Sequence, residues 1–154
     1  MHKPVSARRV ILWIAAVLIV LLIFGQSVLP ETVSREESSW VRDNILAAVF
    51  GWFGLQPPSH NTVRKLAHIF EFTVLSALLL LCFRGKLPRS FFAGFTAAFL
   101  DESIQLLTGR GALVQDIWID LIGVACGVLI GFLLHQLINR TKPIRQNHPE
   151  NREF

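Results

Sequence analysis

The chain has 154 residues, which is enough for one compact unit and too few for two ordinary domains. Hydrophobic residues make up 52% of it and charged residues only 17%, whereas a soluble domain carries roughly a quarter. The net charge of +4 stands in short basic runs beside apolar stretches, so the composition indicates a membrane protein and argues against a nucleic-acid-binding protein.

The first apolar stretch runs from about residue 10 to 29 and follows the basic residues Lys3, Arg8 and Arg9. Its length approaches the ~20 residues that cross the hydrocarbon core of a bilayer. A basic segment before an apolar one is also typical of signal peptides, but no small-x-small cleavage pattern follows before Pro30. We therefore expect a membrane helix that stays in the protein.

An amphipathic helix is predicted next, over about residues 35–54. Ser34 and Glu37 fit a capping box, in which the two side chains satisfy backbone donors of a new helix. Apolar residues then recur at spacings of three and four, and Pro57 and Pro58 end the pattern. Its tryptophan and phenylalanine residues favour a helix lying in the outer membrane interface. A lid packed over the bundle is an equal alternative.

Three further apolar stretches are long enough to be membrane helices. They cover about residues 64–83, 91–107 and 116–138.

The basic residues predict how these helices are oriented. They cluster in the N-terminal segment, in the loop at 84–89 and after Arg140, and such clusters mark the cytoplasmic side. We therefore predict an all-α membrane protein with four transmembrane helices, both termini in the cytoplasm and the amphipathic helix in the first outer loop. Residues 1–140 would form the membrane domain, and residues 141–154 a disordered, basic and polar cytoplasmic tail.

Ionisable side chains interrupt the second, third and fourth apolar stretches. Each costs about 2.5–3.5 kcal/mol in the bilayer centre, so a chain that keeps several of them is expected to use them. Helical geometry and the predicted orientation bring these groups into one layer beneath the outer surface. The residues expected to form this outward-facing ligand-binding site are Lys65, His68, Glu71, Asp101, Glu102, Gln105, Arg110, Asp116 and Asp120.

The last stretch also carries a seam of small residues. Gly123, Gly127 and Gly131 share one helical face with Asp116 and Asp120, and small residues at this spacing let membrane helices approach closely. The two aspartates should therefore point into the bundle. The alternative for Asp116 is a helix N-cap, where a carboxylate is favoured by free backbone amides.

The chemistry of this layer is open from the sequence. His68 and Glu71, with Asp101 and Glu102 opposite, are catalytic candidates, since they supply an acid–base pair and hard ligands for a divalent metal. No metal site is specified, and the cofactor is left unknown. A relay for ion or proton transport, or a bundle in which the charges only neutralise one another, would use the same groups.

Four motifs occur in order: K-x-x-H-x-x-E-F at 65–72, D-E-x-x-Q at 101–105, G-R at 109–110, and D-x-x-x-D-x-x-G at 116–123. With these spacings the chain resembles the VanZ-like family over about residues 10–137. Asp120 stands where many members carry asparagine, which would suit a hydrogen-bonding role better than a charged one.

The resemblance implies a small multi-pass protein of the bacterial cytoplasmic membrane. The family takes its name from a protein that raises resistance to the glycopeptide teicoplanin, so an influence on glycopeptide resistance is expected. We expect an envelope accessory protein whose partners are the bilayer and a cell-wall precursor or lipid headgroup. The alternative is an intramembrane hydrolase or transferase acting on a lipid-linked substrate through His68, Glu71, Asp101 and Glu102. The sequence does not define an oligomeric state.

Overall fold

The computed structural model describes residues 6–109 and 114–140. The elements in these ranges are all helical, as predicted. They are α1 (Ala7–Val28), α2 (Glu31–Val41), the π-helical segment η1 (Arg42–Leu46), α3 (Ala47–Trp52), α4 (His60–Cys82), α5 (Leu87–Leu107) and α6 (Val114–Arg140).

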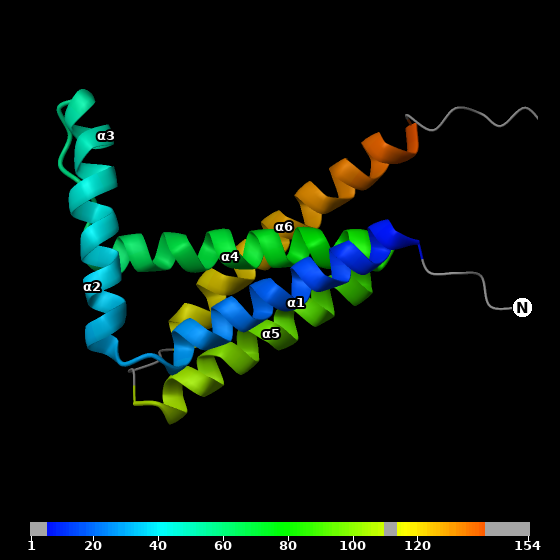
Figure 1. Ribbon diagram of the computed structural model, residues 1–154, viewed down its shortest axis with the longest axis horizontal. Coiled ribbons are helices and arrows are strands. Elements are labelled where there is room, and N and C mark those ends of the chain that lie inside the picture. Colours follow the sequence, from blue (N-terminus) through cyan, green and yellow to red (C-terminus); the bar gives the residue numbers. More distant parts are fainter. Residues whose placement is uncertain (1–5, 110–113, 141–154) are drawn as a thin grey trace, which may run out of the picture.

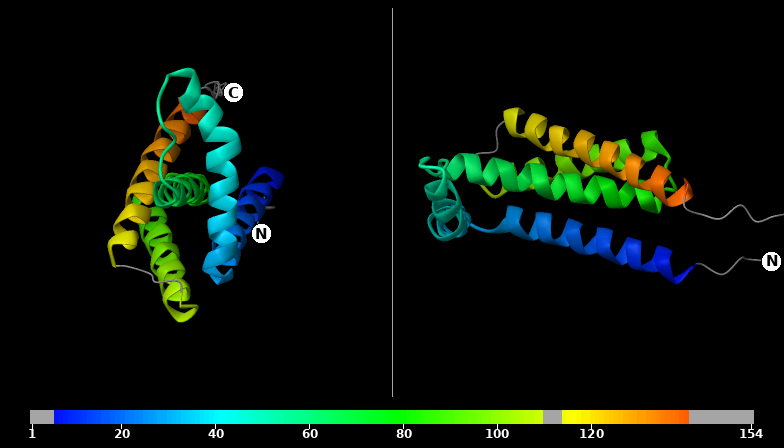
Figure 2. Two further views of the ribbon diagram at one scale, coloured as in Figure 1. Left: turned by 90° about the vertical axis from the view of Figure 1, so that its left-hand side faces the viewer. Right: turned by 90° about the horizontal axis from the view of Figure 1, so that it is seen from above.

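The four long helices run side by side in alternating directions (Figure 1). Helix α4 packs against α1, α5 and α6, and α1 also contacts α5. The segment formed by α2, η1 and α3 crosses the end of the bundle where α1 ends and α4 begins, as both views in Figure 2 show. The start of α1 and the end of α6 therefore lie together at the opposite end (Figure 1).

Three helices within the described ranges are long and apolar enough to cross a membrane: α1, α4 and residues Gln115–Arg140 of α6. Helix α5 has a comparable length of 21 residues but does not join them, because Asp101, Glu102 and Gln105 occupy its last two turns. A multi-pass arrangement is thus confirmed. The fourth span and the cytoplasmic location of both termini stay predictions.

All four long helices begin earlier than the hydrophobic pattern indicates, α4 and α5 by the most. Helix α4 begins at His60 rather than near residue 64, because the Ser59 hydroxyl accepts a hydrogen bond from the backbone amide of Thr62 at 3.3 Å. Helix α5 begins at Leu87 rather than near residue 91, with Pro88 in its first turn, where a missing amide proton costs no hydrogen bond. Hydropathy misses such polar first turns.

The predicted capping box at Ser34 is wrong. Helix α2 begins four residues earlier, after the N-cap residue Pro30, and the backbone amide of Ser34 already donates to the Pro30 carbonyl. The helical path continues through η1 to Trp52, so a helix does fill most of the predicted range. Its position at the membrane interface stays a prediction.

The glycine seam joins α6 to α4. A Cβ atom added at Gly123 would lie 2.6 Å from the carbonyl oxygen of Ile69, and one at Gly131 would lie 2.9 Å from that of Ala77. The hydroxyl of Thr73 donates to the Gly123 carbonyl at 3.2 Å. The two backbones are therefore in direct contact, as the small-residue spacing predicts, and this contact sets the position of Asp120 against α4.

Candidate functional site

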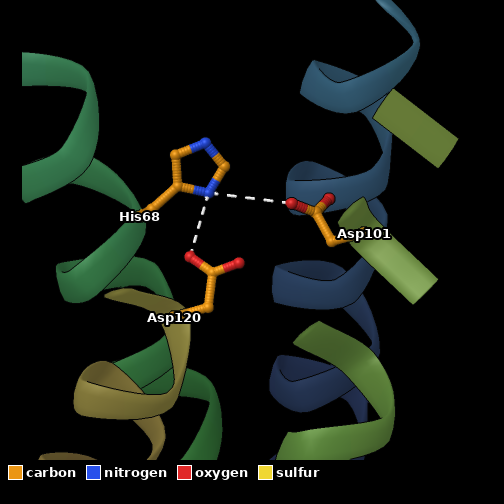
Figure 3. A group of neighbouring side chains, drawn as sticks. All are labelled: His68, Asp101 and Asp120. Atoms are coloured by element: carbon orange, nitrogen blue, oxygen red, sulfur yellow. Dashed lines mark ion pairs between the residues drawn. The ribbon is translucent and has the colours of Figure 1, made fainter. Parts of the chain in front are cut away.

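Three polar side chains from three helices meet near the end of the bundle that α2 crosses. His68 comes from α4, Asp101 from α5 and Asp120 from α6, and Figure 3 shows the Nδ1 atom of His68 turned toward both carboxylates. This atom lies 3.7 Å from Oδ2 of Asp101 and 3.5 Å from Oδ1 of Asp120. Both aspartates are buried, with at most 1% of their surface exposed. These three groups form the centre of the candidate site.

Asp101 is held in place by hydrogen bonds on both of its oxygens. The hydroxyl of Ser27, in the last turn of α1, donates to Oδ1, and the side-chain amide of Gln105 donates to Oδ2 at 2.8 Å. Gln105 in turn accepts a hydrogen bond from the guanidinium of Arg64 at 3.0 Å. The chain Arg64–Gln105–Asp101–Ser27 therefore ties α4, α5 and α1 together and fixes the carboxylate beside His68.

Asp120 has a less complete set of partners. Its Oδ2 atom is buried and makes no hydrogen bond to the described residues. Four other carboxylates, on Glu71, Asp101, Glu102 and Asp116, are close enough to repel it electrostatically. The site therefore gathers acidic side chains where water is excluded, an arrangement that favours a cation or a ligand rich in hydrogen-bond donors.

The other candidate residues surround this centre. Glu71 is partly buried and accepts a hydrogen bond from the side chain of Gln26, and Glu102 is buried at 5% exposure. Lys65 lies at the edge, where its Nζ atom is 3.9 Å from a carboxylate oxygen of Asp116. Arg110 lies outside the described residues.

A cavity of about 180 Å³ adjoins the cluster, between α1, α2 and α4. His68 and Glu71 form part of its wall, so the imidazole separates the buried aspartates from the cavity. Helix α2 covers it with small polar side chains and one acid, and α4 contributes a cation. The remaining lining residues are Gln26, Ser27, Ser34, Glu37, Ser38, Val41, Val63, Arg64 and Ala67.

The histidine and the two aspartates offer one ligand atom each, all within 4.8 Å of one another, so they could hold a metal ion. The sequence had grouped His68 with Glu71, Asp101 and Glu102 as the acid–base and metal-ligating set. The structure instead directs Asp120 at the imidazole and turns Glu71 toward Gln26.

Sequence reasoning missed two members of the site, Ser27 and Arg64. Ser27 is 1% exposed and bonds directly to Asp101, although it lies in the most apolar helix. The adjacent polar residues Gln26 and Ser27 at the end of that helix were the available signal. Arg64 is the first residue of the apolar stretch at 64–83, where a basic side chain is ordinary for a membrane helix, and only the tertiary structure brings it to Gln105.

The fold and this site define a multi-pass membrane protein with a polar centre buried among its helices. Residues 11–135 match the VanZ/LLP1 family, and the chain belongs to that family. Over 80 residues it is 34% identical to the Bacillus subtilis (strain 168) protein described as "Uncharacterized membrane protein YwnJ". This match covers 52% of the chain and 54% of that protein, so it spans about half the length of the relative. No solved structure matches the chain.

Proposed function

We propose that the protein is an accessory protein of the bacterial cell envelope that binds the polar headgroup of a membrane lipid or a lipid-linked cell-wall precursor. The observation that carries this proposal is the cavity beside the buried cluster, which lies between α1, α2 and α4; its surface is more apolar than polar, but eight of its eleven lining residues have polar side chains. A headgroup can enter such a cavity while its acyl chains stay in the bilayer.

The lining fits a phosphate-containing headgroup that also carries amines or hydroxyls. Arg64 offers a planar set of donors for phosphate, and Lys65 is half-exposed one residue further along α4. Glu37 and Glu71 accept hydrogen bonds from amines or hydroxyls. Arg110 is proposed as a second phosphate ligand.

In this proposal α5 is a fourth span, and both termini are cytoplasmic. The phenylalanine side chains of α5 at 92, 95 and 99 are 66%, 38% and 53% exposed, which suits contact with lipid. Its acidic groups face the other helices, where they are buried. The α2–α3 segment then lies at the outer surface, and Trp52, 88% exposed, is placed to anchor it in the interface.

The test is to fill the cavity. Ala67→Leu adds bulk to the lining, whereas Ala125→Leu makes the same change on α6 at a position that is also exposed but does not line the cavity. Native mass spectrometry of protein released from lipid nanodiscs measures which lipids or precursors stay bound. We expect wild type and Ala125→Leu to retain the same ligand, and Ala67→Leu to lose it by roughly tenfold, or ~1.4 kcal/mol. Equal retention by all three proteins would contradict the proposal.

The family's association with teicoplanin suggests a cellular readout. We propose that an occupied site changes glycopeptide susceptibility. Glu71→Gln and Asp101→Asn should then abolish the change in teicoplanin susceptibility that the wild-type protein confers, at equal abundance in the membrane. Unchanged susceptibility at normal abundance would separate the site from resistance.

An intramembrane hydrolase or transferase is the second candidate. The observation that favours it is His68, whose Nδ1 atom lies between two carboxylates while the residue borders the cavity, as a general base requires. Nanodiscs containing phosphatidylglycerol would reveal a released headgroup by mass spectrometry. If the protein is an enzyme, we expect it to release the headgroup, and we expect His68→Gln to abolish this release while the lipid still binds. Binding without turnover favours the accessory role.

A further inference from the structure

We infer that His68, Asp101 and Asp120 bind one divalent transition-metal ion. The inference goes beyond headgroup binding, since it concerns three buried ligand atoms on three helices and needs no occupant in the cavity. These atoms lie within 4.8 Å of one another, and Figure 3 shows them facing a common point.

The distances fit a shared ion better than a direct hydrogen bond. The Nδ1 atom of His68 is 3.5 Å from Asp120 and 3.7 Å from Asp101, longer than the 2.7–3.2 Å typical of an N–H···O hydrogen bond. Ligand atoms ~2.0–2.2 Å from a tetrahedral ion lie roughly 3.4 Å from each other. Small side-chain adjustments would therefore bring all three atoms into a coordination sphere.

A second observation points independently to a ligand. The Oδ2 atom of Asp120 is buried without a hydrogen-bond partner among the described residues, in a side chain only 1% exposed. A buried acceptor without a partner is costly. A bound cation would give this oxygen a partner.

The types of ligand atom indicate the class of metal. One imidazole nitrogen with two carboxylate oxygens suits Mn²⁺ or Zn²⁺, whereas Ca²⁺ and Mg²⁺ prefer shells made only of oxygen. The bonds from Ser27 and Gln105 orient Asp101 and leave its carboxylate with further lone pairs for the ion. Three protein ligands leave a coordination position open for water or an exogenous ligand.

The test uses Mn²⁺ as a paramagnetic probe of the full-length protein in lipid nanodiscs after treatment with a chelator. Titration followed by electron paramagnetic resonance should show one ion bound per chain. Pulsed measurements should show coupling to an imidazole nitrogen, which changes when the histidines are labelled with ¹⁵N. Asp120→Asn should weaken binding by more than about tenfold, as expected for a lost carboxylate ligand. Asp43→Asn, an exposed acid on η1 with 59% of its side chain accessible, should leave binding unchanged.

Circular dichroism of each variant distinguishes lost binding from lost folding. Equal affinity in wild type and folded Asp120→Asn would overturn the inference, as would wild-type protein without nitrogen coupling at saturating Mn²⁺. The nitrogen-coupling measurement uses wild-type protein, so it tests the inference even if Asp120→Asn does not fold. Because no lipid ligand is measured, the outcome is separate from that of the cavity-filling experiment.

Discussion

The two ends of the helix bundle both carry ionisable groups but hold them in opposite ways. At the end crossed by α2, Asp101 and Asp120 are buried between helices. At the other end, Arg8 and Arg84 are exposed around a cleft of about 200 Å³ between α1, α4 and α6. Exposed charges at helix ends cost little and orient a membrane protein, whereas buried ones are costly and are kept where they function. We therefore propose that the basic end sets the orientation of the protein in the membrane and that the acidic end binds the ligand.

The largest effect on stability is expected where α4 and α6 are in close contact, between the two ends of the bundle. A Cβ atom at Gly127 would lie 2.8 Å from Cβ of Ser76 and would also press on the backbone of Thr73. We expect Gly127→Leu to lower the free energy of unfolding by about 1–3 kcal/mol or more, because the helices must separate. Denaturation in detergent, followed by circular dichroism, measures it. Gly25→Leu, at a site with nothing within 4 Å, is the matched control; equal losses would refute the close contact.

The next effect concerns the hydrogen-bond chain at the acidic end. Gln105→Leu removes the link between Arg64 and Asp101, so the guanidinium loses an acceptor and the carboxylate loses a donor. Buried groups left unsatisfied cost about 1–3 kcal/mol. The same unfolding measurement should show a loss in this range, while Gln115→Leu, exposed on α6, should change little. If Gln105→Leu were as stable as wild type, the hydrogen bonds that link Arg64, Gln105 and Asp101 would not contribute to stability.

A smaller effect is expected from two buried serines with different partners. The Ser27 hydroxyl bonds to Asp101, whereas the Ser76 hydroxyl has no partner among the described residues. Ser27→Ala should destabilise the protein by about 0.5–1.5 kcal/mol, since it removes one buried hydrogen bond. Ser76→Ala should be neutral or stabilising. Thermal denaturation compares the stability of the two variants. A larger loss of stability for Ser76→Ala than for Ser27→Ala would contradict this account.

The smallest effect is expected at the rim of the acidic end. Lys65 and Asp116 form a 3.9 Å ion pair in which half of the lysine side chain is exposed. Lys65→Gln should change the free energy of unfolding by less than ~1 kcal/mol, and high salt should reduce the difference further. Arg84→Gln at the basic end should change the free energy of unfolding by a similarly small amount. A large loss for Lys65→Gln alone would mean that the buried cluster extends to this lysine.

Much of the fold could be predicted from the sequence because the bilayer simplifies the problem. Apolar length alone identified the four long helices, and the spacing of Gly123, Gly127 and Gly131 indicated the α4–α6 contact. The start of α2 was missed because a Ser-x-x-Glu pattern outweighed Pro30, a residue that also favours the entry to a helix.

Only part of the site could be predicted from the sequence. Periodicity placed His68, Asp101 and Asp120 on inward faces, but it does not say which carboxylate meets the imidazole, since this depends on helix rotation and register. Ser27 was missed because one hydroxyl in an apolar helix usually bonds to its own backbone. The Ser27 hydroxyl does so, to the carbonyl of Ile23 at 3.1 Å, and also reaches Asp101 on another helix.

The most direct test of the central claim, that the buried cluster is a binding centre, is a crystal structure grown from a lipid phase with Mn²⁺ and recorded for anomalous scattering. The account predicts one anomalous peak between His68, Asp101 and Asp120, about 2.0–2.3 Å from a ligand atom of each. An imidazole bonded directly to one aspartate at ordinary hydrogen-bond distance, with no peak beside it, would contradict the claim.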